Sequence, residues 1–241
     1  MNRIPDRPIT VIYRTRTSGT LQEMTRTLLD TASLKDSLPS DRSSVIGLKP
    51  NLVVSQPAEG GATTHPEIVE GTIQYLQGLG YDSIVILEGA WVGDSTAKAF
   101  SACGYRRLAE RYNVGLVDTK KDAATAAETG GYSLQICSIM KQIDFLINMP
   151  VLKGHCQTHY TGALKNLKGC IPDSEKRRYH SLGLHEPIAR LNRVISQDFI
   201  IMDGICGDPT FEEGGSPSSL DRLLCSTDPV MLDSYACTLI G

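Results

Sequence analysis

Residues 143–155 read IDFLINMPVLKGH, and this stretch decides the fold that we expect. Its first part, IDFLINM (143–149), is largely apolar, which is typical of a strand buried on both faces of a parallel sheet. Its second part brings a proline, a lysine and a histidine, and ends at His155. In open α/β sheets, ligands bind beyond the carboxyl ends of the strands, so we expect a functional site to begin here.

Comparable apolar runs recur along the chain and alternate with windows that have apolar residues at helical spacing. The runs predict strands at residues 9–13, 45–48, 83–88, 113–118 and 198–203. The windows predict helices at about 20–34, 64–80, 95–104, 105–112, 161–168, 186–196 and from Asp228 onward. This alternation predicts an α/β fold, with a mostly parallel sheet, helices on both faces and a ligand cleft at the carboxyl ends of the strands. No linker interrupts the pattern, so residues 1–241 are expected to form a single α/β domain.

Composition excludes several classes of protein. With 241 residues, 41% of them hydrophobic, the chain can bury a large core without a disulfide or metal staple. A net charge of −3 and an aromatic content of 6% give no reason to expect nucleic acid as a partner. No window approaches the ~18–20 apolar residues of a membrane span, so we expect no membrane partner and a cytoplasmic location.

The pattern of the seven cysteines predicts reduced thiols, not a disulfide framework or a metal-binding cluster. Their number is odd, and no two of them have the CxxC spacing. This pattern argues against a disulfide framework, a zinc ribbon and an iron–sulfur cluster motif. Cys156 and Cys170 differ from the rest because both lie near cationic residues, which would lower the pKa of a thiol.

Charge is strongly segregated in the second half of the chain. The segment from Lys153 to Arg193 holds four of the five histidines and eight lysines and arginines, against three acids. The next segment, from Val194 to Gly241, holds eight carboxylates and one arginine. Cationic donors and imidazoles beside a carboxylate-rich run indicate a site for an anion, a metal or both.

Polar residues also follow nearly every predicted strand, and parallel strands would bring them to one edge of the sheet. They are Lys49, Asn51, Glu88, Asp94, Asp118, Asn148, Lys153, His155, Asp203, Asp208, Glu212 and Glu213.

Some polar features of the sequence have a structural interpretation instead of a functional one. The residues with capping spacing, Thr64 and Asp228, are expected to be helix N-caps, and His65 to be structural. Surface segments are expected at 121–133, at Lys176–Arg178 and at the acidic turn Glu212–Glu213.

His155 and His159 have the i, i+4 spacing of many zinc sites, but Gly154 and Pro150 argue against a helix there. An anion pocket is the favoured alternative, because lysine and imidazole donate hydrogen bonds to carboxylate or phosphate oxygens. Lys165 and Lys168 can alternatively complement a helix dipole. The chain has no GxxxxGK[ST], no GxGxxG after the first strand and no GxSxG, so known nucleotide and serine-hydrolase motifs are absent.

Several runs together resemble the domain of unknown function family numbered 362. They are KPNLV (49–53), TTHPE (63–67), INMPVLKGH (147–155), TGALKNLKGCIP (161–172), the lysine and YH of 176–180, IMDGICG (201–207) and STDPVMLD (226–233). The resemblance implies no activity, because the family is named for lacking one. Many members carry a ferredoxin-like iron–sulfur module after this domain, and these 241 residues contain none. Relatives also usually continue beyond the last run, so we expect either a domain truncated at its C-terminus or a shortened member of the family. A more distant similarity to the lactate racemase family, whose nickel-pincer site uses lysine and histidine, is an analogy of fold only.

Three hypotheses of function follow. The first is an enzyme, an oxidoreductase or an isomerase, that binds a small anionic metabolite in a cleft lined by lysine and histidine. Its expected catalytic residues are His155, Lys153 and Lys165. Its expected substrate-binding residues are Lys49, Asn51, Thr161, Asn166 and His180, with Asp203 and Glu213 as expected ligands of a divalent metal. The second is a metal- or cofactor-binding electron-transfer protein with a redox partner, and the third is a non-catalytic module that binds an acidic partner.

Overall fold

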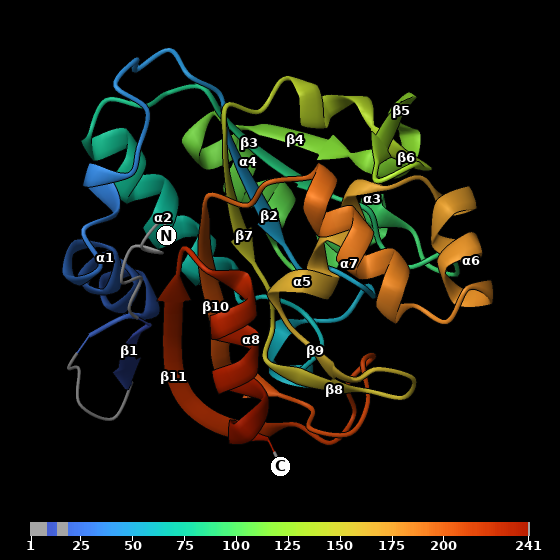
Figure 1. The fold of residues 1–241 in the computed structure, drawn as a ribbon. Coiled ribbons are helices and arrows are strands. Elements are labelled where there is room, and N and C mark those ends of the chain that lie inside the picture. Colours follow the sequence, from blue (N-terminus) through green and yellow to red (C-terminus); the bar gives the residue numbers. More distant parts are fainter. Residues whose placement is uncertain (1–8, 14–18, 241) are drawn as a thin grey trace, which may run out of the picture.

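A seven-stranded sheet forms the centre of the protein, in the order β1-β11-β10-β7-β2-β3-β4 among the described residues (Figure 1). The structure is a computed structural model that describes residues 9–13 and 19–240, with the backbone alone for 11–13. Five adjacent strands are parallel: β10 (Phe199–Gly207), β7 (Phe145–Met149), β2 (Ile46–Pro50), β3 (Ile84–Glu88) and β4 (Gly115–Asp118). Strand β11 (Ser218–Ser226) pairs antiparallel with β10, and β1 (Thr10–Tyr13) pairs antiparallel with β11. The predicted mostly parallel sheet is therefore confirmed.

Helices cover both faces of this sheet because successive strand residues point to opposite faces. In β7, Phe145, Ile147 and Met149 join one core and Leu146 joins another. The first core is covered by α1 (Leu21–Thr31), α2 (Pro66–Gly78), α3 (Thr96–Ala102) and α4 (Tyr105–Tyr112). The other face is covered by α5 (Ala163–Asn166), α6 (Asp173–Ser181), α7 (His185–Val194) and α8 (Pro229–Ala236). Short 3₁₀ turns lie at Leu34–Asp36, Ala58–Gly60, Thr119–Lys121, Ser138–Lys141, Leu167–Cys170 and Cys237–Leu239.

The order of the parallel strands reverses between β2 and β7. From β2 the chain moves through β3 to β4 on one side, and it later returns to β7 and β10 on the other side. Such a reversal is where open α/β sheets leave a crevice beyond the carboxyl ends of the strands. Residues that follow β2, β3, β7 and β10 therefore have a common place to meet. Among the described residues, no helix combines the length and apolar character that crossing a bilayer would require.

Two hairpins lie where the sequence did not predict strands. Residues 121–133, expected to be a surface excursion, contribute β5 (Ala124–Thr129) and the start of β6 (Tyr132–Cys137), which pair antiparallel. Leu134 and Ile136 of β6 are buried in the core beside α7. Both turn residues, Gly130 and Gly131, have positive φ, as two-residue hairpin turns require. The alanine-rich β5 gave no strand signal because its stability comes from this packing.

The second hairpin replaces the helical arrangement considered for the two histidines. Strands β8 (Lys153–His155) and β9 (His159–Thr161) pair antiparallel, with His155 directly opposite His159. His155 is buried, whereas His159 is exposed and has φ of 60°. The two imidazoles therefore do not share a helical face. Gly154 packs so closely against the backbone of Pro209 that a Cβ there would collide with it.

Two other local predictions are corrected and one is confirmed. Thr64 does not cap a helix: α2 begins after His65, and Thr64 Oγ1 donates to Met149 O at 2.7 Å. The segment Lys176–Arg178 is not a loop but part of α6. Asp228 is the expected N-cap of α8, because its side chain accepts the N–H groups of Val230 and Met231.

Candidate functional site

A cavity of about 510 Å³ opens at the carboxyl ends of the parallel strands. Its walls come from the segments after β2 and β3, the β8–β9 hairpin, α5 with the following 3₁₀ turn, α6, and the loop after β10. Six predicted site residues line it: Asn51, Thr161, Lys165, Asn166, His180 and Glu213. The cleft expected at the ends of the strands is therefore present, and several segments distant in sequence build it.

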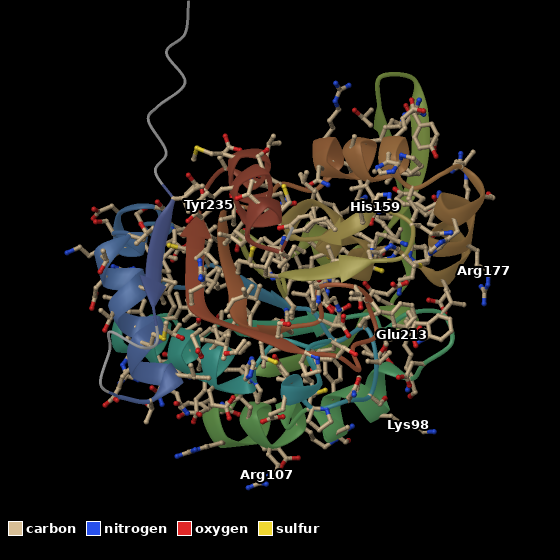
Figure 2. All side chains as sticks on the ribbon, turned by 90° about the horizontal axis from the view of Figure 1, so that it is seen from below. Lys98, Arg107, His159, Arg177, Glu213 and Tyr235 are labelled. Carbon is tan, nitrogen blue, oxygen red and sulfur yellow. The ribbon has the colours of Figure 1, made fainter. Side chains whose placement is uncertain are left out.

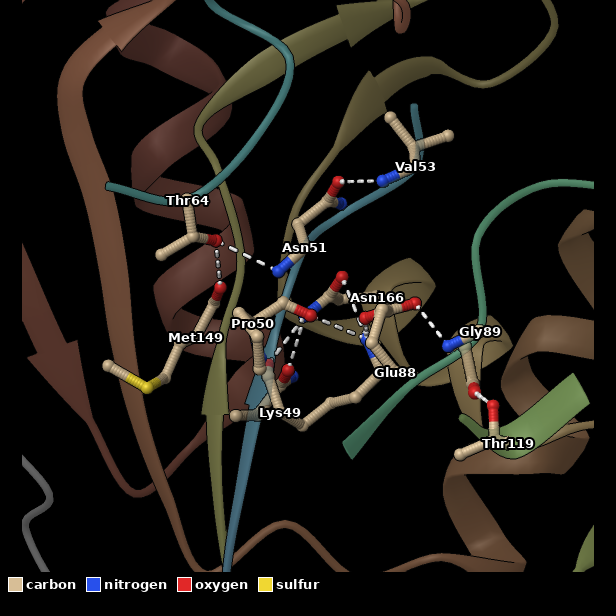
Figure 3. Close-up of polar contacts among 12 residues, drawn as sticks. Lys49, Pro50, Asn51, Val53, Thr64, Glu88, Gly89, Thr119, Met149 and Asn166 are labelled. Atoms are coloured by element: carbon tan, nitrogen blue, oxygen red, sulfur yellow. Dashed lines mark hydrogen bonds and ion pairs between the residues drawn. The ribbon is translucent and has the colours of Figure 1, made fainter. Parts of the chain in front are cut away.

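Lys49 forms part of the floor beneath the cavity instead of its lining. Its side chain is fully buried, and Nζ pairs with the Glu88 carboxylate and donates to Pro50 O at 2.7 Å (Figure 3). Burial raises the pKa of Glu88, and the adjacent Lys49 partly opposes this shift. The predicted substrate-binding lysine is thus occupied by a carboxylate of the protein itself.

Asn166 links this floor to the strand at the reversal point. Its amide nitrogen donates to Asn148 Oδ1 at 2.7 Å and to Lys49 O at 3.2 Å, and its Oδ1 lies 3.4 Å from Lys49 Nζ. Asn148 in turn donates to Gln197 Oε1 at 2.6 Å and to Ala163 O at 2.8 Å. Because every amide atom has a partner, Asn166 is held in one orientation at the cavity surface.

Two glycines make the floor thin. A Cβ on Gly169 would collide with Glu88 Oε1 and with the end of the Lys49 side chain. A Cβ on Gly89 would collide with Thr119 Oγ1, which donates to Gly169 O at 2.6 Å. The backbone can approach the buried ion pair only because both positions lack a side chain.

Lys153 holds three segments together under the cavity. Its Nζ donates to Glu212 O at 2.8 Å, to Asn51 Oδ1 at 3.2 Å and to Ala62 O. Burial lowers the pKa of this amine to about 7, although Glu212 and Glu88 favour its charged form. Lys153 therefore ties the loop after β10 to the segments that follow β2, and it does not reach the cavity wall.

His155 is held in one tautomer. Its Nδ1 accepts the backbone N–H of Gln157 at 3.0 Å and of Thr158 at 3.2 Å, which leaves the ring proton on Nε2. Nε2 lies 3.3 Å from Glu212 Oε1. Burial, together with the nearby Lys165, lowers the pKa of His155 to about 3 despite Glu212. The structure thus places His155, an expected catalytic residue, as a neutral donor beside Glu212.

Lys165 and Lys168 form the cationic wall of the cavity. Among the described residues, Lys165 Nζ donates to Thr161 Oγ1 alone, at 3.3 Å, and Lys168 Nζ lies 3.1 Å from His180 Nε2. Neither amine forms an ion pair within the part of the chain that the structure describes. Burial and the neighbouring amines Lys168 and Lys153 lower the pKa of Lys165 well below its usual range. Burial, and next Lys176, lowers the pKa of Lys168 to about 8.

His180 and Lys176 complete the polar lining. His180 Nδ1 lies 2.9 Å from Gln157 Oε1, so its Nε2 is the acceptor for Lys168. Lys176, expected to be solvated, is buried, and its Nζ donates to Gly89 O at 3.0 Å and Ala90 O at 2.9 Å. Burial lowers its pKa, and Glu88 opposes that shift. Arg177 is exposed at the rim and points outward (Figure 2).

Asp203, one of the two expected metal ligands, lies away from the cavity lining. Its Oδ2 accepts His65 N and faces His65 Nδ1, each at 2.8 Å, and its Oδ1 accepts Ile205 N at 3.0 Å. Burial opposes a charge on His65, but Asp203 outweighs it and raises the pKa of the imidazole. The pair fixes the start of α2 to β10, a structural role for His65. Asp203 thus lies outside the lining of the cavity to which Glu213 contributes.

His155, Cys156 and Glu212 bring together one nitrogen, one sulfur and one oxygen donor, all within 4.8 Å of one another. Metal-binding histidines donate their second ring N–H to a neighbour, whereas the second nitrogen of His155 accepts two backbone N–H groups. Cys156 is exposed, but slight desolvation, followed by the effect of Glu212, raises the pKa of its thiol, contrary to the expected effect of nearby cations. As arranged, the three residues do not fit a metal ion.

Sequence reasoning missed several cavity residues. Glu212 was expected at this edge of the sheet but was assigned to an acidic turn, and for Lys168 only the alternative of complementing a helix dipole was named. Trp91 and Val92 were not singled out at all. The available signal was positional, since Glu88, Trp91 and Glu212 all follow predicted strands that end at the same edge of the sheet.

Three comparisons place the chain among known proteins. It is 27% identical over 234 residues to the thylakoid-associated protein sll1697 of Synechocystis sp., a match that covers 90% of this chain and 68% of that protein. Its structure is similar to the lactate racemase apoprotein from Thermoanaerobacterium thermosaccharolyticum, with a TM-score of 0.57 and 14% identity. That match covers 91% of this chain and 54% of the racemase chain, so this chain spans about half of its length and shares its fold. A model of the family described as "Domain of unknown function (DUF362)" matches residues 46–238, and the chain therefore belongs to this family.

Proposed function

We propose that the protein is an enzyme that binds a small anionic metabolite in the cavity and transfers a proton to or from it. One observation carries this proposal: Lys165 and Lys168 line a cavity at the ends of the strands without a carboxylate partner among the described residues. Two unpaired, partly desolvated amines are costly for the folded protein alone, and a bound anion would offset that cost.

The two lysines suit different roles. Lys168, with a pKa of about 8, remains mostly charged at neutral pH and can hold the anion. Lys165, with its pKa lowered further by burial, has more of the neutral amine that a general base requires. His155 acts as a positioning residue, because it does not line the cavity itself and its Nε2 faces Glu212, which does.

An isomerase-type reaction is favoured over an oxidoreductase by analogy with the racemase fold, which is an argument from fold alone. An oxidoreductase would use the same anion site with an electron acceptor that these residues do not supply. The two reactions differ in their products: isomerisation leaves the oxidation state of the metabolite unchanged, whereas oxidation or reduction changes it.

A thermal-shift screen of small carboxylates and phosphates tests the anion site. Lys165→Ala and Lys168→Ala should each weaken or abolish the shift produced by every compound that stabilises the wild-type protein. The matched control is Lys98→Ala, because Lys98 is an exposed lysine of α3 that points outward and does not line the cavity (Figure 2). If both cavity variants keep the full response, the assignment of these lysines is wrong.

A metal-dependent redox function is the second candidate, because three donor atoms converge at His155, Cys156 and Glu212. The tautomer of His155 argues against it. Elemental analysis of anaerobically purified protein decides between the two. Stoichiometric metal that is lost in Cys156→Ser would overturn the tautomer argument.

We also propose a cytoplasmic location, supported by the absence of any disulfide among the seven cysteines, all of which lie in the described residues. The relative from Synechocystis sp. is named for an association with thylakoids, so fractionation of cells that express the protein is the appropriate test. Recovery in the membrane pellet would contradict this proposal.

A further inference from the structure

The cavity has a second wall that is apolar. Val53, Trp91 and Val92 line it, from the segments that follow β2 and β3. Trp91 is 45% exposed, and it is one of only four large hydrophobic residues that are exposed in the described part of the chain. A large apolar side chain exposed inside a cavity that also contains charged donors is typical of ligand sites, where it binds the apolar part of the ligand.

The backbone around Trp91 is held in place. Trp91 N donates to Val53 O at 3.0 Å, and Lys120 Nζ donates to Trp91 O at 3.1 Å and to Asp94 O at 2.7 Å. The Asp94 carboxylate accepts the N–H and the hydroxyl of Ser55 at 2.6 Å and 2.9 Å. The loop after β3 is thereby fixed to the loop after β2, so the position of the tryptophan is organised before a ligand arrives.

The indole ring itself lies over Gly93. A Cβ at this position would collide with the six-membered part of the ring, so only glycine leaves room for it. The ring is thus supported by its own loop while it contributes to the cavity wall. A supported, flat aromatic surface favours a flat group as its partner.

The size of the cavity agrees with a ligand larger than the smallest metabolites. An acid of about six non-hydrogen atoms fills less than ~180 Å³, if each atom is given the ~30 Å³ that a water molecule occupies in the liquid. The cavity measures about 510 Å³. Beside an anionic group at Lys168, there is room for a further group of the size of an aromatic ring.

We infer that the ligand of this cavity is an anion that carries an aromatic or similarly flat apolar group. The anionic group binds at Lys165 and Lys168, and the flat group packs against Trp91 with Val53 and Val92. This inference rests on the proposed function, because it assigns the substrate class of the same site. It differs from that proposal in requiring the apolar wall as well as the cationic one.

Paired probes test the inference by titration calorimetry. Phenyl phosphate is compared with inorganic phosphate, and phenylacetate with acetate, so the two pairs also distinguish a phosphate from a carboxylate ligand. In at least one pair, the compound with the ring should bind ~10-fold tighter or more. Trp91 is the only tryptophan of the chain, so the fluorescence of the protein should change with that compound and report binding at the cavity itself.

Single substitutions distinguish the contribution of the apolar wall to binding from that of the cationic wall. Trp91→Ala should remove the preference for the ring, and Lys168→Ala should weaken all probes that bind, whereas Lys98→Ala should change neither. If the ringless anions bind wild-type protein as tightly as their aromatic partners, the inference is overturned and the proposed function stands. If Trp91→Ala keeps the full preference, the inference is likewise overturned. If none of the four probes binds, the anion site itself is contradicted, and the inference falls with it.

Discussion

Burial sets the charge state of the lysines around the cavity. Lys153 and Lys165 are both shifted toward the neutral amine, but their surroundings differ. Lys153 is surrounded by oxygen acceptors of three segments, whereas in the described part of the chain Lys165 bonds to a single hydroxyl. We therefore propose a structural role for Lys153 and exchange of a proton with a ligand for Lys165.

Anion binding should depend on pH through Lys168. Its pKa of about 8 means that the amine loses its charge as the pH rises through that value. Because the anion binds the protonated form, affinity is full below the pKa and lost above it. The dissociation constant of a bound phosphate or carboxylate should thus rise between about pH 7 and about pH 9 in calorimetric titrations.

Lys168→Arg is the matched variant for this dependence, because a guanidinium stays charged up to about pH 12. Its dissociation constant should vary less over the same interval than that of the wild-type protein. An identical pH profile in both proteins would show that another group governs the dependence.

At the scale of elements, α8 supports the segment that carries the cavity lysines. Asp233 of α8 accepts the N–H of Ala163 at 2.7 Å and of Leu164 at 3.0 Å, at the start of α5. Tyr160 of β9 donates to the same carboxylate at 3.1 Å. A helix outside the cavity therefore fixes both ends of the stretch from β9 to α5, and so the backbone of Lys165.

Asp233→Ala should leave two N–H groups at the start of α5 unpaired and lower the free energy of unfolding by ~1–3 kcal/mol. The same variant should weaken anion binding, since Lys165 follows directly in α5. Urea unfolding and calorimetry measure the two effects. Ser234→Ala, at the exposed neighbouring position, is the control. An unfolding midpoint equal to that of the control would contradict this role of Asp233.

The sequence predicted well those elements whose own residues determine their structure, through apolar character or through a capping side chain. Strand β7 is apolar along its length, and Asp228 caps α8 with its own side chain. Strand β11 has the mixed sequence SSLDRLLCS, and α6 is mostly polar, so packing against neighbours decides both. For the same reason, the sequence could assign Lys153 and His155 to the region of the site. It could not predict that both lie beneath the cavity and not in its lining.

At the scale of the whole molecule, one sheet separates two cores. Ile147 belongs to the core under α1 and α2, and its neighbour Leu146 belongs to the core under α7. Strands β3 and β7 contribute buried side chains to both cores, so loss of packing in one core would disturb strands that the other core also needs. The single α/β domain stays a prediction, and it implies that the two cores unfold together.

Substitutions on the two faces test that prediction. Ile147→Ala and Leu146→Ala should each lower the free energy of unfolding by ~2–5 kcal/mol, through lost burial and the cavity left behind. Both should shift one common transition, followed by circular dichroism and by fluorescence, while Lys98→Ala leaves it in place. Two transitions that respond separately to the two substitutions would contradict a single domain.

The two glycines beneath the cavity restrict the substitutions that this site can tolerate. Gly89 and Gly169 carry no reactive group. A Cβ at Gly169 would nevertheless collide with the Lys49–Glu88 pair, and a Cβ at Gly89 would collide with Thr119 Oγ1. In a saturation library selected for anion binding, we expect these two positions to accept no other amino acid. At the outward-pointing Lys98, which does not line the cavity, many replacements should by contrast survive. The least variable positions of this site would then be residues that take no part in its chemistry.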